Sequence, residues 1–194
     1  MQRTLYAVRE YPLNIAINPP FEFTTQRLVL RSPVLDDAPA IFAAYASKPH
    51  IPKFMSWIAH SDIEQTAGFM RRCISEWIEK SNFEFVIELR NSPKKPIGMI
   101  GMHPLKHGVG FGYVIAEEFW NQGITSEALT RLLDWSLDQD VVYRAQAFCD
   151  VENLASARVM EKAGMTLEGT LRRFFLHPNM SDEPRDSLMY AKVK

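Results

Sequence analysis

Residues 108–129 read GVGFGYVIAEEFWNQGITSEAL, and this stretch decides the fold. In its first half, large apolar side chains occupy alternate positions, as in a half-buried strand: Val109, Phe111, Tyr113 and Ile115. The positions between them include three glycines: Gly108, Gly110 and Gly112. Because these glycines leave one face of the strand bare, we expect something to approach its backbone closely there. From about residue 122 onward, apolar residues recur at helical spacing, which predicts that the strand turns directly into a helix.

The start of this helix is a candidate anion site. A helix N-terminus presents unpaired N–H groups and a partial positive charge, and a glycine there lets a phosphate approach the main chain. We therefore expect an anion at the backbone of five consecutive residues: Gln122, Gly123, Ile124, Thr125 and Ser126. Spacing alone fits a plain strand–helix turn with a packing glycine equally well, because the segment is neither the GxGxxG fingerprint nor a P-loop.

The patterns on either side predict the remaining elements. Upstream, we expect a strand at 21–31 and a short helix that begins after Asp36. A second helix is expected to open at Ser61, with Glu64 as its capping box. Three strands are then expected at 83–90, 96–103 and 109–116. Downstream, we expect a helix at 122–138, a strand at 142–149 and a helix at 153–162 that is closed by Gly164. Two final strands are expected at 165–175 and 186–193.

This order of elements predicts an α+β fold with a twisted, mixed, mostly antiparallel sheet of about seven strands and about four helices. Short turns favour antiparallel neighbours, whereas the strand–helix–strand unit at 109–149 predicts a right-handed crossover between parallel strands. Residues 21–194 are expected to form one domain. Residues 1–20, which contain several prolines, are expected to form an N-terminal extension. The sequence leaves open whether this extension wraps the domain or pairs two chains in a homodimer.

Composition narrows the class of protein. The chain has 194 residues, is 46% hydrophobic and carries a formal net charge of −1, which argues against nucleic-acid binding through bulk positive charge. The N-terminus lacks the apolar run of a signal peptide, and no apolar stretch approaches the roughly 18 residues of a membrane span. Cys73 and Cys149 are expected to be reduced thiols in a cytoplasmic protein without membrane partners.

Four segments, taken together with their order along the chain, resemble the GNAT superfamily of N-acetyltransferases, and within it the RimJ/RimL-like branch. The turn WNQGITSEA at 120–128 is similar to the family's phosphate-binding motif, and GYVI at 112–115 to the strand before it. Thr25, Arg27 and Leu28 begin an opening segment typical of the branch. A later segment combines Asn153, Ser156, Val159, Glu161, Lys162, Gly164 and Met165. The resemblance covers residues 22–194 and implies the GNAT fold, in which two central strands splay apart.

Two residues depart from the family pattern. Trp120 stands where the motif usually has Gln or Arg, and we expect its backbone rather than its side chain to shape the turn. Thr125 stands where a smaller residue is usual, so we expect its side chain to point away from the phosphates.

The resemblance implies how acetyl-CoA is used as the cosubstrate. The pyrophosphate would bind the amides of 122–126, and the pantetheine arm would lie along Tyr113, Val114 and Ile115. The N–H near Val114 would stabilise the thioester oxygen. Asn153 would reach the pantetheine, and the hydroxyl of Ser156 would serve the leaving thiolate, with Tyr113 as the next candidate. Without the resemblance, Asn153 and Ser156 fit a simple helix cap.

No acid occupies the positions at which members of the family carry their general base. The positions where family members carry an acid are 108–111 and Phe175, and neither has one here. His103, Glu84, Asp150 and Glu152 remain, and His103 is a candidate because histidine titrates near neutral pH; a water chain is the alternative. His103 and His107 lie in a turn without a further ligand, so no metal site is expected.

The expected function is transfer of an acetyl group from acetyl-CoA to a small-molecule amine or a protein N-terminus. An acyl-CoA-binding module without catalysis is the alternative, and the missing carboxylates favour it. Ser156 and the intact phosphate turn favour the enzyme.

Overall fold

The computed structural model describes residues 14–194. Within them, one mixed sheet of eight strands runs in the order β1-β2-β3-β4-β5-β6-β8-β7. The strands are β1 (Glu22–Thr24), β2 (Leu28–Arg31), β3 (Phe83–Leu89), β4 (Ser92–Pro104), β5 (Gly108–Ile115), β6 (Arg144–Asp150), β7 (Thr166–Phe175) and β8 (Arg185–Val193). The α+β class is confirmed, with eight strands instead of about seven.

The additional strand comes from the segment predicted as one strand at 21–31. A tight turn at 25–27 divides it into β1 and β2, which then pair with each other in antiparallel register. In this turn the Thr25 hydroxyl oxygen accepts a hydrogen bond from the Leu28 N–H at 2.9 Å. Side-chain alternation could not show the break, because Phe23, Leu28 and Leu30 are all buried on the two sides of it.

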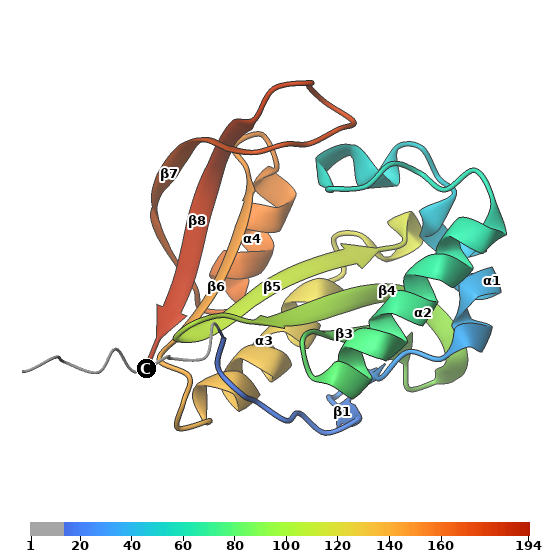
Figure 1. Ribbon diagram of the computed structural model, residues 1–194, viewed down its shortest axis with the longest axis horizontal. Coiled ribbons are helices and arrows are strands. Elements are labelled where there is room, and N and C mark those ends of the chain that lie inside the picture. The colour runs from blue at the N-terminus through green and yellow to red at the C-terminus, as the bar shows by residue number, and fades with distance from the viewer. Residues whose placement is uncertain (1–13) are drawn as a thin grey trace, which may run out of the picture.

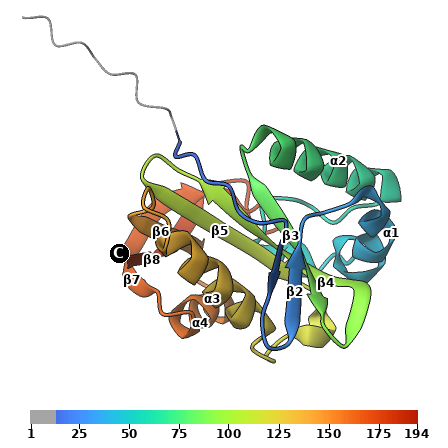
Figure 2. The same ribbon diagram turned by 90° about the horizontal axis from the view of Figure 1, so that it is seen from below.

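Four α-helices cover the two faces of the sheet. They are α1 (Ala38–Ile41), which continues into a π-helical turn at Phe42–Ala46, α2 (Ile63–Glu79), α3 (Ile124–Leu137) and α4 (Leu154–Lys162). Short 3-10 turns lie at Leu35–Asp37, Ile51–Phe54 and Glu117–Phe119. Figure 2 shows α1 and α2 on one face and α3 and α4 on the other. None of the helices within residues 14–194 is long and apolar enough to cross a membrane.

The N-cap of α2 is Asp62, so the prediction of Ser61 is wrong. Asp62 has the extended backbone that an N-cap needs, with φ −137° and ψ 145°, and its side chain accepts from the Glu64 N–H. Ser61 lies one residue earlier, and its N–H donates to the Gln65 side chain at 3.0 Å.

The parallel pair predicted at 109–149 is present, and its strands separate partway along. β5 pairs with β6 only at Gly108↔Arg144, Val109↔Ala145 and Gly110↔Gln146, although both strands continue further. Figure 1 shows the two ribbons diverging beyond this point. The splay expected between the central strands is therefore confirmed.

The glycine face of β5 has two different environments. A Cβ on Gly108 would collide with the Arg144 carbonyl of β6, so the close approach there comes from the neighbouring strand. Gly112 is exposed, and a Cβ there would meet only the His103 ring at 3.9 Å. The expectation of one continuous bare face is thus wrong at Gly108.

The predicted N-terminal extension falls partly outside the described residues, since 1–13 are not among them. Residues 14–20 have irregular backbone. The Ile15 N–H donates to the Leu105 carbonyl at 2.8 Å, and Ile17 is buried in the main core. This part of the chain therefore packs against the domain.

Candidate active site

The turn before α3 has the backbone geometry of an anion site. Gly123 is the N-cap residue in the left-handed region, at φ 74° and ψ 6°, and Asn121 has a positive φ of 58°. The Gly123 carbonyl accepts from the Glu127 N–H, so the N–H groups of the first helical turn have no partner inside the helix. The Thr125 side chain is buried, which removes its bulk from the open side of the turn.

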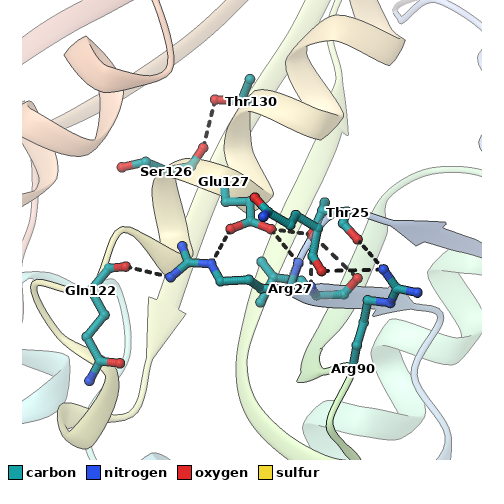
Figure 3. A network of polar contacts seen from close by, with 9 residues as sticks. Thr25, Arg27, Arg90, Gln122, Ser126, Glu127 and Thr130 are labelled. Atoms are coloured by element: carbon teal, nitrogen blue, oxygen red, sulfur yellow. Dashed lines mark hydrogen bonds and ion pairs between the residues drawn. The ribbon is translucent and has the colours of Figure 1, made fainter.

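Arg27 connects this turn to the first strands of the sheet. As Figure 3 shows, its Nη1 donates to the Gln122 carbonyl at 3.0 Å and its Nε to Glu127 Oε2 at 2.6 Å. The Glu127 carboxylate also accepts from the Thr25 hydroxyl and from the Arg27 N–H. Arg27 Nη2 lies 3.6 Å from the position that a Cβ on Gly123 would take. The guanidinium thus holds the turn and adds positive charge next to it.

The ion pair between Arg27 and Glu127 affects the charge at the start of α3. A carboxylate in the first turn of α3 would repel an anion at the same helix end. Partial burial would raise the pKa of Glu127, but the hydrogen bonds from Thr25 and Arg27 outweigh it and lower the pKa. Glu127 is therefore ionised and neutralised by Arg27, so the backbone N–H groups set the sign of the local field.

Two predicted catalytic residues meet where β5 and β6 have separated. The Tyr113 hydroxyl lies 2.8 Å from Ser156 Oγ and also donates to the Ser156 carbonyl at 3.2 Å. Asn153 caps α4 through Oδ1, which accepts from the Ser156 N–H at 3.1 Å. The side chain of Ser156 is therefore not the cap. Its hydroxyl and that of Tyr113 form a pair beside the part of β5 that no longer pairs with β6.

The edge of β5 is partly occupied from within the chain. The Ile115 carbonyl accepts from Trp120 Nε1 at 3.0 Å, which occupies the end of this edge. In the turn that follows β5, the side chain of Gln122 donates to the Glu118 carbonyl at 2.6 Å. Trp120 thus shapes the turn through its side chain as well as its backbone. Tyr113 and Val114 lie next to this edge and line a cavity on the α1–α2 face of the sheet.

This cavity has a volume of about 770 Å³. Its wall is aromatic and apolar over α1, α2 and the 55–57 segment, and it includes Tyr45, Trp57 and Phe69. Polar side chains reach it from the loop before α2 and from α2, β3 and β4: His60, Gln65, Arg72, Glu84 and His103. Glu84 on β3 and His103 on β4 stand together at its floor, with Glu84 Oε1 3.6 Å from His103 Nε2.

The remaining acids considered as bases are placed differently. Asp150 is fully buried and accepts from Arg185 Nε at 2.7 Å, and Glu152 accepts from Arg185 Nη2 at 2.6 Å. Burial would raise the pKa of Asp150, but the Arg185 hydrogen bond outweighs it and lowers the pKa. Both carboxylates form ion pairs with Arg185. Glu84 and His103 are the candidates that line the cavity.

Sequence reasoning overlooked several contributors. The sequence marks Arg27 only as part of the opening segment of the family, and no pattern in it points to Tyr45 or Gly101. The signal for Gly101 is its register: it stands opposite Glu84 on one side and Gly112 on the other, which is visible only once β3, β4 and β5 are paired.

Comparison with known proteins agrees with this geometry. The family described as Acetyltransferase (GNAT) domain matches residues 27–166. A Bacillus subtilis (strain 168) protein, Uncharacterized N-acetyltransferase YoaA, is 31% identical over 173 residues, which cover 88% of this chain and 95% of that protein.

Two solved structures show the same fold. One is the Microcin C7 self immunity acetyltransferase MccE in complex with acetyl-CoA and AMP, with a TM-score of 0.80, 22% identity and coverage of 91% of this chain and 98% of that one. The other is the RimL ribosomal L7/L12 alpha-N-protein acetyltransferase in complex with coenzyme A, with a TM-score of 0.75, 22% identity and coverage of 87% and 95%. On the family match, the YoaA identity and the splayed sheet described above, this chain belongs to the acetyltransferase (GNAT) domain family.

Proposed function

We propose that this chain transfers an acetyl group from acetyl-CoA to a primary amine by direct attack of the amine on the thioester. The observation that carries the proposal is the Tyr113–Ser156 hydroxyl pair, placed where β6 has left β5 and next to a cavity. Acetyl-CoA supplies the activated acetyl group, and the residues of the chain bind, orient and move protons.

The turn at 122–126 fits a pyrophosphate. Its free N–H groups, the left-handed Gly123 and the nearby Arg27 guanidinium all favour an anion. In this role Gln122, Gly123, Ile124, Thr125 and Ser126 act through their backbone. Glu127 does not oppose binding, because Arg27 neutralises it.

The pantetheine arm is proposed to lie along Tyr113, Val114 and Ile115. Since the ladder with β6 ends at Gly110, this part of β5 has an edge that an extended chain can pair with. The Ile115 carbonyl is held by Trp120, so the pairing rests on the residues before it. Asn153 Oδ1 caps α4, which leaves the amide nitrogen of Asn153 to face the arm. The Val114 N–H would stabilise negative charge on the thioester oxygen.

Ser156 is proposed to protonate the departing thiolate, with Tyr113 relaying the proton through the 2.8 Å contact. An acyl-enzyme on cysteine is disfavoured, because burial raises the pKa of the neighbouring Cys149 thiol to about 11 and keeps it protonated near neutral pH. Direct attack by the amine needs no such nucleophile.

The acceptor is proposed to be a small-molecule amine or a protein N-terminus that binds in the cavity beside Val114. His103 was the predicted base, and its place on the cavity floor supports a role in removing the amine proton. The RimL protein is named for acetylating a ribosomal protein α-amine, and its fold is shared here at 22% identity.

Two measurements on the purified chain test this function. Calorimetry with acetyl-CoA measures binding, and thiol release in the presence of an amine panel measures turnover. Binding with amine-dependent thiol release is expected. Binding without release for every amine would instead favour an acyl-CoA-binding module, and no binding at all would refute both functions.

A further inference from the structure

We infer that Glu84, together with His103, binds the acceptor as an alkylammonium ion and removes its proton, so that the acceptor is a strongly basic small primary amine. This inference rests on the proposed acetyl transfer and specifies its acceptor side.

The first argument is the row of residues across three strands. Glu84 stands opposite Gly101, and Gly101 opposite Gly112, so all three lie on the cavity face of β3, β4 and β5. The two glycines carry no side chains, and the His103 ring occupies the space over Gly101, between Glu84 and the free part of β5. A Cβ on Gly101 would collide with Glu84 Oε1 and come within 2.7 Å of the His103 ring. Gly101 therefore makes room for this pair.

The second argument is that His103 Nε2 carries no proton on the side that faces Glu84. His103 Nδ1 lies 3.1 Å from Asn82 Oδ1, and because that oxygen is an acceptor, the hydrogen bond requires the proton on Nδ1. Nε2 is then an acceptor, and it faces Glu84 Oε1 at 3.6 Å. When Glu84 is ionised, the two atoms are acceptors side by side, and they fit a donor that brings N–H groups to both. An ammonium ion is such a donor.

The third argument is the surroundings of the carboxylate. The rings of Tyr45, Trp57 and Phe69 line the cavity, and aromatic faces attract cations. The Tyr45 hydroxyl is buried and has no hydrogen-bond partner within the described residues. Asn179 on the β7–β8 loop donates to the Pro52 and Trp57 carbonyls at 2.7 and 2.8 Å, which holds this wall in place. The cavity thus suits an ammonium group on a compact apolar body.

The titration of the pair is set by several groups. Burial, which is the largest cause, and the Glu76 carboxylate on α2 raise the pKa of Glu84, the Arg72 guanidinium lowers it, and the net result is a pKa of about 7. Tyr45 and Cys73 also face Glu84, but burial raises the pKa of each, so both stay neutral near pH 7. Burial lowers the pKa of His103. A base with a pKa near the working pH is effective at removing a proton.

The proton balance is as follows. An alkylamine with a pKa of about 10 arrives protonated and gives one proton to the Glu84–His103 pair. The nitrogen lone pair then forms the N–C bond while the C–S bond breaks, and the sulfur takes the bonding electrons. The thiolate gains a proton from the Tyr113–Ser156 pair, and the second proton lost by nitrogen restores that pair. The net release is one proton, which Glu84 passes to solvent.

The test compares Glu84→Gln with the wild type and with Glu79→Gln, an exposed carboxylate on α2 that lies outside the site. The amine panel contains 2-phenylethylamine, which is protonated at pH 7, aniline, which is already neutral, and a short peptide with a free α-amine. For 2-phenylethylamine, kcat/KM should fall about 10²- to 10⁴-fold in Glu84→Gln, whereas for aniline it should change by less than about tenfold. The wild-type rise of kcat/KM with pH near 7 should disappear in this variant.

Acetyl-CoA affinity should be unchanged in both variants. Wild-type thiol release with 2-phenylethylamine and equal release by Glu84→Gln would overturn this inference and leave the acetyl transfer standing. Release only with the peptide would overturn the acceptor class. If wild type released thiol with none of the amines in the panel, both the proposed function and this inference would be overturned.

Discussion

Replacing Ser156 with alanine separates catalysis from helix capping. In the structure, Asn153 Oδ1 is the cap acceptor of α4, and Ser156 contributes only its backbone N–H to that cap. The Ser156 hydroxyl instead contacts the Tyr113 hydroxyl at 2.8 Å. Ser156→Ala therefore keeps the cap and removes one end of the proposed proton relay.

The expected loss in kcat is about ten- to a thousand-fold. A general acid contributes roughly 10²–10⁴, and because Tyr113 remains in the variant, the expected loss is about tenfold smaller than that. In free energy this is about 1.4–4 kcal/mol of activation barrier. Stability should fall by only about 0.5–1.5 kcal/mol, the usual net worth of one hydrogen bond. In a chain of this length, each kcal/mol lowers Tm by about 2–4 °C.

The assay measures kcat, the KM for acetyl-CoA and Tm on the same preparations. Asn153→Ala is the matched control for the cap and should lose about 1 kcal/mol of stability. Ser75→Ala is the matched control for a serine hydroxyl, because Ser75 bonds Glu79 on the exposed face of α2. Unchanged kcat in Ser156→Ala together with a lowered Tm would refute the role in catalysis, and Tyr113→Phe would then be the next variant.

Three further changes probe the turn and the cavity floor. Gly123→Val should weaken CoA binding by calorimetry, because its φ of 74° disfavours a branched side chain and the added bulk occupies the phosphate side; unchanged affinity would refute the placement. Arg27→Gln should also weaken CoA binding, lower stability near neutral pH and make the loss of stability at low pH less steep. Together with the Thr25 hydroxyl, Arg27 lowers the pKa of Glu127, and a carboxyl with a lowered pKa stabilises the fold at neutral pH and loses this contribution as pH falls; a slope of stability against pH equal to that of the wild type would argue against this coupling. Gly101→Ala should lower kcat with CoA affinity intact, since its Cβ displaces Glu84 and His103; normal turnover would contradict the floor geometry.

The local elements of this protein follow from its sequence, because they depend on short-range periodicity and chemistry. The 108–129 stretch predicts a strand that enters a helix through a glycine turn, and the structure has β5, Gly123 and α3 in that order. The parallel relation of β5 and β6 also follows, since a helix joins them. The exceptions are local: the break at 25–27 and the cap at Asp62 each depend on one backbone conformation that periodicity does not encode.

Only the tertiary structure decided which side chains share the site. Tyr113 and Ser156 are 43 positions apart in the chain, and Arg27 lies 95 positions from Gln122, so no local pattern relates them. The same holds for the candidate bases. The sequence favours His103, and strand register places Glu84 beside it, with Glu84 Oε1 3.6 Å from His103 Nε2 and Gly101 and Gly112 next to the pair. Sequence periodicity determines which face of a strand a residue occupies, whereas the pairing of distant strands determines what it faces.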